Sequence, residues 1–381
     1  MPKRLPSAPP VLSGYTYVRP LGTGGFADVF LYEQDLPRRV TAVKVLLADV
    51  VDPDARRTFT LEADAMARLS AHPSIVTIHQ ASIASDGRPY LVMEYCPESL
   101  GARVKRGPMP AGEVLDIGVR MAGALETAHR SGLLHRDIKP SNLLVNSLGA
   151  PVLADFGIAG SIGDDGAGDT LAMSVPWSAP EVLGERTNGT VASEVWSLGA
   201  TLYTLLAGHS PFELADRSRN TVDQLSRRVL GAKYTPLAPR GAPARVDTVL
   251  AAAMQRDPAR RYRSMAEFGE QLRWAQYELG TAPTSLEVAS PEWAAAAPVD
   301  FSDPARRGPV VTTVDPDSRR AGRAAAVAAA RPAKRVIDDG GLAPASARPR
   351  GRWLLPAAIG AGSALVVLAA AAAAAFASGV M

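Results

Sequence analysis

The stretch that decides the fold is LLHRDIKPSNLLV, residues 133–145. Apolar residues on both sides enclose a polar group that falls within eight positions: His135, Arg136, Asp137, Lys139 and Asn142. A carboxylate in so apolar a segment is costly to bury unless hydrogen bonds, a cation or a metal accompany it. The pattern therefore indicates a built site around Asp137, although on this stretch alone the polar residues could simply brace a turn.

The chemistry that such a set suits is transfer of a group to a hydroxyl. A carboxylate can hold an acceptor hydroxyl and receive its proton, while nearby cationic and amide side chains steady a polyphosphate and its metal. Asp137, Lys139 and Asn142 supply these three kinds of side chain at a close spacing.

Composition narrows the class of protein further. The formal net charge is only +3 over 381 residues, which argues against a general nucleic-acid-binding protein. The single cysteine, Cys96, excludes an internal disulfide and favours a reducing compartment. We interpret Cys96 as a small core residue rather than a nucleophile, because no basic partner lies near it in the sequence. The histidines lack the spacing of a zinc site.

The pattern of apolar residues divides the first 277 residues into two parts. Residues 15–95 hold β-branched and aromatic runs typical of strands, interrupted by one segment, residues 52–71, that is rich in helix formers. From about residue 112 the apolar residues recur at helical spacing. Further helices are predicted at residues 195–208, 246–254 and 265–279. The sequence therefore predicts an α+β fold with a small sheet-rich part and a larger helical part.

The remainder of the chain changes character after Tyr277. Residues 278–352 are dominated by Ala, Pro and Arg, which predicts a disordered linker because such a segment cannot bury enough apolar surface to fold. Residues 353–381 carry no charged side chain and exceed the roughly 20 residues that span a bilayer. We expect a transmembrane helix there; the alternative is an Ala-rich helix or low-complexity end that inserts nowhere.

Three motifs together resemble a known family. HRDIKPSN at 135–142, ADFGIA at 154–159 and SAPE at 178–181 occur in the order and spacing of eukaryotic-type (Hanks-type) serine/threonine protein kinases found in bacteria. The resemblance covers residues 15–277 and implies the bilobal protein kinase fold. It places a β-rich N-lobe with one helix at about 15–95 and a helical C-lobe at about 96–277, after an N-terminal extension of residues 1–14.

The resemblance implies a pocket for ATP. LGTGGFADVF, residues 21–30, matches the glycine-rich loop that covers the phosphates, with Ala27 where the family has its third glycine. Its glycines let the backbone approach phosphate oxygens. The residues expected to contact the nucleotide are Leu21, Gly22, Gly24, Gly25, Val29, Ala42, Lys44, Leu144 and, in the hinge Met93–Cys96, Glu94 and Cys96. No GxxxxGK[ST] motif is present, which excludes a P-loop ATPase.

The family pattern also implies the catalytic roles. Lys44 would bind the α- and β-phosphates and pair with Glu62 on the following helix. Asn142 and Asp155 would hold Mg²⁺, or Mn²⁺, because both offer hard oxygen ligands. Asp137 would receive the proton of the acceptor hydroxyl, and Lys139 would neutralise the phosphoryl group in transfer.

Further positions match regulatory and structural residues of the family. Thr170 is the candidate for activating phosphorylation, its phosphate pairing with Arg136, and Ser174 is expected to contact Asp137 and Lys139. Glu181 is expected to form a buried ion pair with Arg261. Glu194 stands where the family has an aspartate that binds the backbone of the HRD loop. Its additional methylene would shift the acceptors by about 1.5 Å, which questions the catalytic rate rather than the fold.

The leading hypothesis is an active serine/threonine kinase that uses ATP and Mg²⁺. It would act on protein substrates, itself in trans included, and not on nucleic acid. It would be held at the cell membrane by one span with the kinase domain in the cytoplasm, since the N-terminus lacks an apolar run. A pseudokinase scaffold, degraded at Glu194 and Ala27, and a tail that chiefly dimerises through Ala358, Gly360 and Gly362 remain as alternatives.

Overall fold

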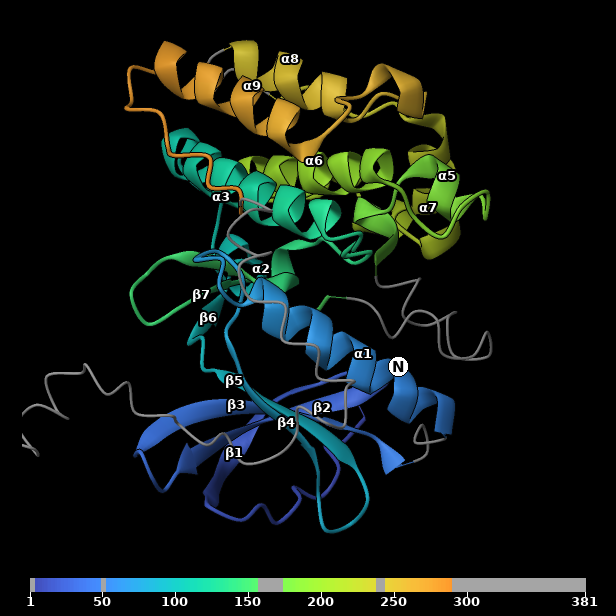
Figure 1. Cartoon of the computed structure of the whole chain (residues 1–381). Coiled ribbons are helices and arrows are strands. Elements are labelled where there is room, and N and C mark those ends of the chain that lie inside the picture. Colours follow the sequence, from blue (N-terminus) through green and yellow to red (C-terminus); the bar gives the residue numbers. More distant parts are fainter. Residues whose placement is uncertain (1–3, 49–52, 157–173, 238–243, 290–381) are drawn as a thin grey trace, which may run out of the picture. The chain divides into compact units, whose positions relative to one another are not determined.

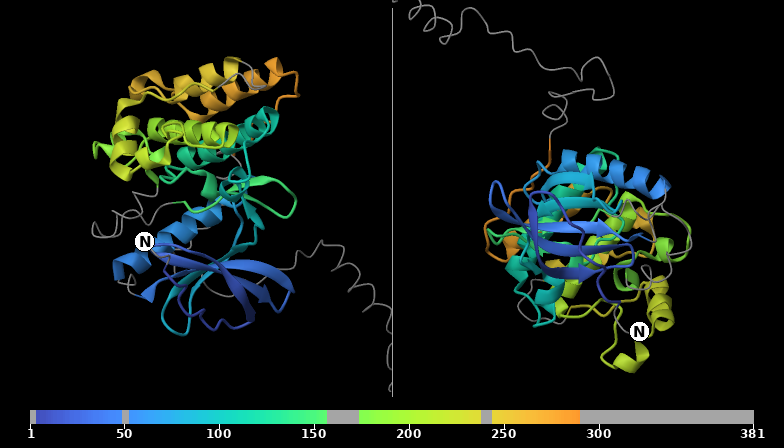
Figure 2. Two further views of the ribbon diagram at one scale, coloured as in Figure 1. Left: turned by 180° about the vertical axis from the view of Figure 1, so that it is seen from behind. Right: turned by 90° about the horizontal axis from the view of Figure 1, so that it is seen from below.

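The structure is a computed structural model that describes residues 4–48, 53–156, 174–237 and 244–289. Within these ranges the chain forms a sheet-rich N-lobe and a helical C-lobe (Figure 1). The predicted α+β organisation in two lobes is therefore confirmed. Figure 2 shows the same elements from behind and from below.

The N-lobe is built on one antiparallel sheet with the strand order β1-β2-β3-β5-β4. Its strands are β1 (Tyr15–Thr23), β2 (Ala27–Gln34), β3 (Arg39–Leu46), β4 (Ile78–Ile83) and β5 (Pro89–Glu94). Helix α1 (Pro53–Leu69) connects β3 to β4, and its buried residues recur at helical spacing: Phe59, Ala63, Met66 and Leu69. Strand β2 pairs with β3 in a register that sets Val29 opposite Lys44.

The first residues of the chain pack onto this sheet. We call residues 4–12 the N-terminal arm. Leu12 is buried in a hydrophobic cluster with residues of β2, β3 and β5, and the hydroxyl of Tyr32 donates a 2.6 Å hydrogen bond to the carbonyl of Pro10. The carboxylate of Asp28, which is fully buried, accepts hydrogen bonds from the backbone N–H of Ser7 (2.7 Å) and from the guanidinium of Arg4. This contact was not predicted, because the arm lacks apolar periodicity.

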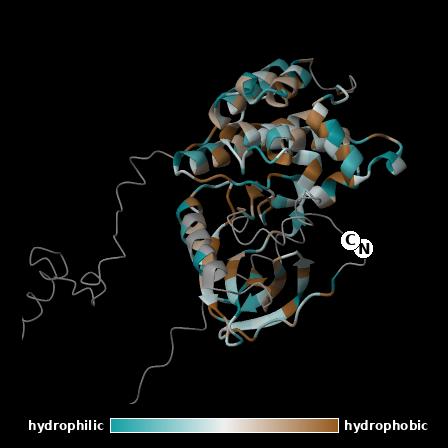
Figure 3. Ribbon diagram, turned by 90° about the vertical axis from the view of Figure 1, so that its right-hand side faces the viewer, coloured by the Kyte–Doolittle hydropathy of each residue, from teal (hydrophilic) through white to brown (hydrophobic). Residues whose placement is uncertain are grey.

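The C-lobe consists of helices packed around a continuous hydrophobic core. Its longer helices are α3 (Ala111–Arg130), α6 (Val191–Ala207), α7 (Val222–Gly231), α8 (Ala244–Ala253) and α9 (Met265–Glu278). Shorter ones are α2 (Leu100–Val104), α5 (Pro180–Leu183), η2 (Pro140–Asn142), η5 (Val175–Trp177), η6 (Arg217–Arg219) and η7 (Pro258–Arg260). Hydrophobic residues lie along these helices and on the central strands (Figure 3). Helices α1, α3, α6, α8 and α9 were predicted; α7, which is short and largely polar, was not.

A three-stranded sheet connects the two lobes. Strands β6 (Glu98–Ser99), β7 (Leu143–Val145) and β8 (Pro151–Leu153) are antiparallel in this order. The turn between α1 and β4 bonds to β8, since Leu153 N–H donates to Ser74 O and Val76 N–H donates to Leu153 O, each at 2.9 Å. Residues at the end of α1 are thereby tied to the strand that precedes Asp155.

The folded part of the chain continues beyond the boundary predicted at Tyr277. Helix α9 ends at Glu278, and residues 279–289 then run along α3 (Figure 1). Thr284 Oγ1 donates a 2.7 Å hydrogen bond to Asp116, and Leu286 packs against the hydrophobic core. The predicted linker therefore starts too early, because composition alone did not reveal that a short segment with two leucines and one valine could pack on two helices. The rest of the linker, from residue 290, lies outside the described residues.

The predicted transmembrane segment, residues 353–381, also lies outside the described residues. Among the helices that the structure does describe, none combines the length and hydropathy that crossing a membrane requires.

The C-lobe contains an ion pair that is buried on both sides. The guanidinium of Arg261 binds the carboxylate of Glu181 through two hydrogen bonds of 2.6 and 2.8 Å, and the side chains are 0% and 7% exposed. Arg261 also donates to the carbonyls of Gln255 and Ala192, and its guanidinium lies 4.9 Å from the ring centre of Trp196. The sequence pattern had paired these two residues, and the structure brings them together.

We predict that Arg261→Met lowers the free energy of unfolding by about 3–5 kcal/mol, because it leaves the Glu181 carboxylate buried without a partner. Urea denaturation measures the change. Arg273→Met is the matched control, since Arg273 pairs with Glu270 on the surface, and we expect less than about 1 kcal/mol there. Equal losses in the two variants would contradict the prediction.

Candidate active site

Asp137 and Lys139 both bind the hydroxyl of Ser174, and all three residues were named from the sequence. Ser174 Oγ donates to Asp137 Oδ1 at 2.8 Å, and Lys139 Nζ lies 3.0 Å from the same hydroxyl. Lys139 Nζ also forms a 2.7 Å ion pair with Asp137 Oδ2. The carboxylate of Asp137 is thus held between a cation and a hydroxyl, which is the arrangement that a base receiving a hydroxyl proton requires.

The backbone around Asp137 is fixed by its neighbours in sequence. Asn142 Nδ2 donates to Asp137 O at 2.8 Å and to Asp137 Oδ2 at 3.0 Å. His135 is fully buried; its Nδ1 accepts from Asp137 N–H at 3.2 Å, so its Nε2 carries the proton and donates to Ala154 O at 2.9 Å. Burial lowers the pKa of His135, which keeps the ring neutral. His135 therefore ties the loop of Asp137 to the residue before Asp155.

Lys44 and Asp155 meet where the two lobes join. Lys44 Nζ lies 3.0 Å from Asp155 Oδ1. The positive charge of Lys44, which outweighs the effect of burial, holds the pKa of the Asp155 carboxyl below its ordinary value, so the group stays ionised at neutral pH. The cation expected to bind phosphate thus lies beside the carboxylate expected to hold a metal. Glu62 belongs to α1, but its side chain lies outside the part of the chain that the structure describes.

The oxygen ligands available here fit a hard divalent cation. Asn142 uses its amide nitrogen to bind Asp137, and its amide oxygen accepts a 3.3 Å hydrogen bond from the Ser141 hydroxyl. A carbonyl oxygen has two lone pairs, so this oxygen can still bind a cation. Asp155 contributes an ionised carboxylate. Mg²⁺ characteristically takes one or two protein oxygens and completes its shell with phosphate and water. In the described residues no three Asp, Glu, His or Cys side chains lie close enough together to hold a metal ion by themselves. A Mg²⁺ ion that also binds the phosphates does not need three such ligands from the protein.

The residues expected to contact adenine belong to one hydrophobic cluster. Ala42 is buried in it, and Leu21, Val29, Leu144 and Cys96 pack against it partly buried. Burial, followed by the nearby charge of Glu94, raises the pKa of the Cys96 thiol to about 12, so this thiol is not a nucleophile at neutral pH. The side chain of Glu94 accepts from the N–H of Thr77 at 2.9 Å, which fixes the end of β5.

The glycine-rich loop forms a tight turn between β1 and β2. Gly22 lies in β1, and Gly24 and Gly25 lie in the turn that follows. Gly24 N–H donates to Ala27 O at 2.9 Å, and a Cβ on Gly24 would lie 3.0 Å from that oxygen. The loop therefore closes with Ala27 in place of the third glycine of the family, and the close approach that needs a glycine occurs at Gly24.

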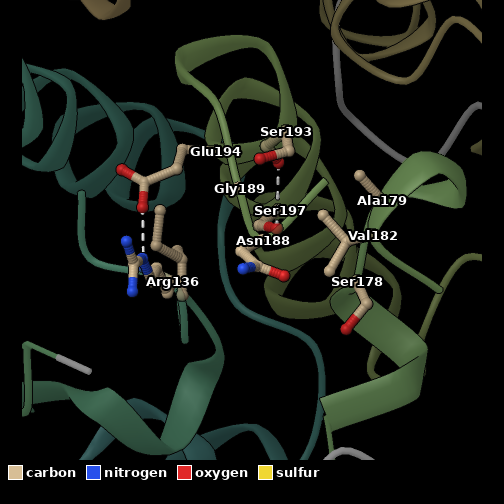
Figure 4. A pocket seen from close by; sticks show the side chains of 10 residues that line it. Arg136, Ser178, Ala179, Val182, Asn188, Gly189, Ser193, Glu194 and Ser197 are labelled. Carbon is tan, nitrogen blue, oxygen red and sulfur yellow. Dashed lines mark hydrogen bonds between the residues drawn. The ribbon is translucent and has the colours of Figure 1, made fainter. Parts of the chain in front are cut away.

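Glu194 holds the backbone of the loop that carries Asp137. Its Oε1 accepts from Arg136 N–H at 2.6 Å (Figure 4), and its Oε2 lies 2.6 Å from His129 Nε2. Arg136 has a φ of 65°, in the left-handed region that residues other than glycine rarely adopt. A backbone in that region costs about 1–3 kcal/mol unless its surroundings enforce it. Glu194 supplies part of that enforcement, so the longer side chain still reaches the loop.

Some site residues were not predicted, and two predicted ones cannot be assessed. Thr170 lies outside the described residues, and so does the side chain of Glu62. The sequence analysis identified the motif that contains His135 but gave that histidine no role. It did not identify His129 as the partner of Glu194. Both histidines act through contacts between distant segments, which the sequence does not reveal. The one feature of the sequence that both share is a histidine next to apolar residues.

Comparisons with known proteins agree with this geometry. The model of the protein kinase domain family matches residues 15–270. Serine/threonine-protein kinase PknK of Mycobacterium tuberculosis is 41% identical over 300 residues, which cover 78% of this chain and 26% of PknK. PknF of the same organism is 36% identical over 309 residues, 76% of this chain and 62% of PknF.

A solved structure shows the same fold. The crystal structure of a cysteine-to-alanine mutant of the M. tuberculosis PknI kinase domain superposes with a TM-score of 0.54 and 31% identity, over 71% of this chain and 99% of that chain. The chain therefore belongs to the protein kinase family, and its resemblance to the bacterial serine/threonine branch is confirmed. It spans about a quarter of the length of PknK.

We predict that Glu194→Gln lowers the free energy of unfolding by about 1–3 kcal/mol and also lowers turnover. The amide is uncharged and keeps one oxygen, so both partners lose the carboxylate's charge, and either Arg136 N–H or His129 also loses its oxygen partner. Urea denaturation and phosphoryl-transfer rates measure the two effects. Glu270→Gln on the exposed face of α9 is the control, with an expected change within about 0.5 kcal/mol. A Glu194→Gln protein as stable and active as the wild type would show that the loop needs no such support.

Proposed function

We propose that the chain is an ATP-dependent serine/threonine protein kinase that transfers the γ-phosphoryl group of ATP to serine and threonine hydroxyls of proteins. The observation that carries this proposal is the hydroxyl of Ser174 bound by both Asp137 and Lys139, at 2.8 and 3.0 Å. A substrate hydroxyl bound in the same manner would have its proton next to a carboxylate and its oxygen next to a cation.

The reaction follows from these positions. The acceptor oxygen forms a bond to the γ-phosphorus, the bond from phosphorus to the β-phosphate oxygen breaks, and ADP leaves. Asp137 takes the hydroxyl proton, and Lys139 neutralises charge that develops on the transferred group. Lys44 binds the α- and β-phosphates. A Mg²⁺ or Mn²⁺ ion held by Asn142 and Asp155 would neutralise the phosphates and align them.

A pseudokinase scaffold is the competing function. It rested on the departures at Glu194 and Ala27. Glu194 still accepts from Arg136 N–H, and the turn at Gly24 still closes on Ala27. Both observations favour the active kinase.

We further propose that residues 353–381 form a single span that tethers the domain to the cell membrane, with the domain in the cytoplasm. The uncharged, apolar composition of this segment supports the proposal. Tethering through a long linker would raise the local concentration of neighbouring copies and favour phosphorylation of Thr170 in trans. The small residues Ala358, Gly360 and Gly362 would bring two such helices together.

Asp137→Asn should lower phosphoryl transfer by about 10²–10⁴-fold, since the amide cannot accept the proton while the nucleotide site is untouched. The measurement is incorporation of labelled phosphate into the protein and into a generic acceptor protein, with ATP and Mg²⁺ present. The control is the affinity for the nucleotide, which should differ from that of the wild type by no more than about twofold, because the substitution removes no group expected to contact the nucleotide. If wild type and variant both incorporate no phosphate, the chain is not a kinase.

Deletion of residues 353–381 should move the protein from the membrane fraction to the soluble fraction and reduce phosphorylation of Thr170 in cells. The physical reason is the lost local concentration of neighbouring copies. Fractionation and phosphosite mapping at equal expression measure both effects. Unchanged phosphorylation after a complete shift to the soluble fraction would separate activation from proximity.

A further inference from the structure

The segment that follows the last helix spans the two lobes. We call residues 279–289 the strap. At its middle, Thr284 N–H donates to Gln276 Oε1 of α9 at 2.9 Å, and Thr284 Oγ1 donates to Asp116 of α3. Near its end, Ala289 N–H donates to Thr127 Oγ1 of α3 at 3.1 Å. The strap thus follows α3 over most of that helix (Figure 1).

Two helix glycines let the strap approach. A Cβ on Gly123, in α3, would lie 2.2 Å from Glu287 O, closer than any real contact allows. A Cβ on Gly269, in α9, would lie 2.8 Å from Leu286 Cδ1. Glycine inside a helix is less favourable than alanine, so its use at these two positions is explained by the strap that lies over them.

Glu287, near the end of the strap, binds the turn that joins α1 to β4. Glu287 O accepts a 2.9 Å hydrogen bond from Nε2 of His72, a residue that is 6% exposed. The Nδ1 atom of the same ring accepts from Ser74 N–H at 3.1 Å, which fixes the proton on Nε2. A neutral His72 therefore joins the strap to this turn, and His72 N–H in turn bonds Leu69 O at the end of α1.

The hydrogen bonds continue from this turn to the active site. Ser74 and Val76 both bond to Leu153 in β8, two residues before Asp155. Between Leu153 and Asp155 lies Ala154, whose N–H donates to Asn142 O at 3.0 Å and whose carbonyl accepts from His135. Hydrogen bonds between buried or part-buried groups, together with short runs of backbone, thus connect Glu287 to the loop of Asp137.

We infer that the strap is a positioning element of the active site, acting through His72 on β8, Asp155 and the end of α1. This inference rests on the proposed kinase function.

The alternative is that the strap adds only general stability. A double-mutant cycle on the full-length chain distinguishes a positioning role of the strap from general stability. Gly123→Ala displaces Glu287 and hence the strap, His72→Ala removes the receiving side chain, and the third variant combines both. Gly231→Ala is the matched control, because a Cβ there meets no atom within 4 Å.

If the strap acts through His72, each single variant should lower kcat/KM for ATP by about tenfold, and the double variant by no more than the worse single one. His72→Gln should recover most of the activity, because its amide can still donate to Glu287 O. Hydrogen exchange should rise in residues 70–76 and 151–155 in each single variant. The Gly231→Ala protein should match the wild type.

Two outcomes would overturn the inference. One is a double variant whose loss is the product of the single losses. The other is variants that melt at a lower temperature yet keep the wild-type kcat/KM for ATP and wild-type exchange at residues 151–155. Failure of the proposed function is distinguishable, because hydrogen exchange at residues 151–155 tests the strap even if the wild type transfers no phosphate.

Discussion

The structure depends on one constraint. A carboxylate that is buried in the protein must have a cation or hydrogen-bond donors beside it. Glu181 and Glu194 are buried in the C-lobe, and Asp137 is partly buried. Glu181 binds Arg261, Glu194 binds His129 and the backbone of Arg136, and Asp137 binds Lys139 of its own loop and the more distant Ser174. A carboxylate left unpaired in such surroundings would cost several kcal/mol. The three sets of contacts therefore fix how the loop of Asp137, the segment that begins at Ser174 and helix α6 lie against one another.

This arrangement explains how a departure from the family pattern is tolerated. Glu194 replaces a shorter side chain, yet it binds both Arg136 N–H and His129, and these contacts hold Arg136 at a φ of 65°. The constraint acts on the acceptor oxygens and not on the length of the side chain that carries them.

The sequence was sufficient for features that short motifs or periodicity encode. The strands and the helix of the N-lobe follow from β-branched runs and helical spacing, and Lys44, Asp137, Asn142 and Asp155 follow from motif positions. It was insufficient for contacts between distant segments of ordinary composition. The N-terminal arm, the strap and His72 fall in this group, because nothing in residues 279–289 distinguishes a segment that packs from one that does not until Gly123 and Gly269 are seen beneath it.

The N-terminal arm has a practical consequence for anyone who prepares this protein. Asp28 follows directly on the glycine-rich turn, and although burial raises its pKa, the hydrogen bonds from Ser7 and Arg4 outweigh burial and hold the pKa below its ordinary value. Arg4 also donates to the carbonyl of Gly24 in that turn. An affinity tag fused immediately ahead of Arg4 would place foreign residues beside these contacts, so a tag that is removed before assay preserves the glycine-rich turn.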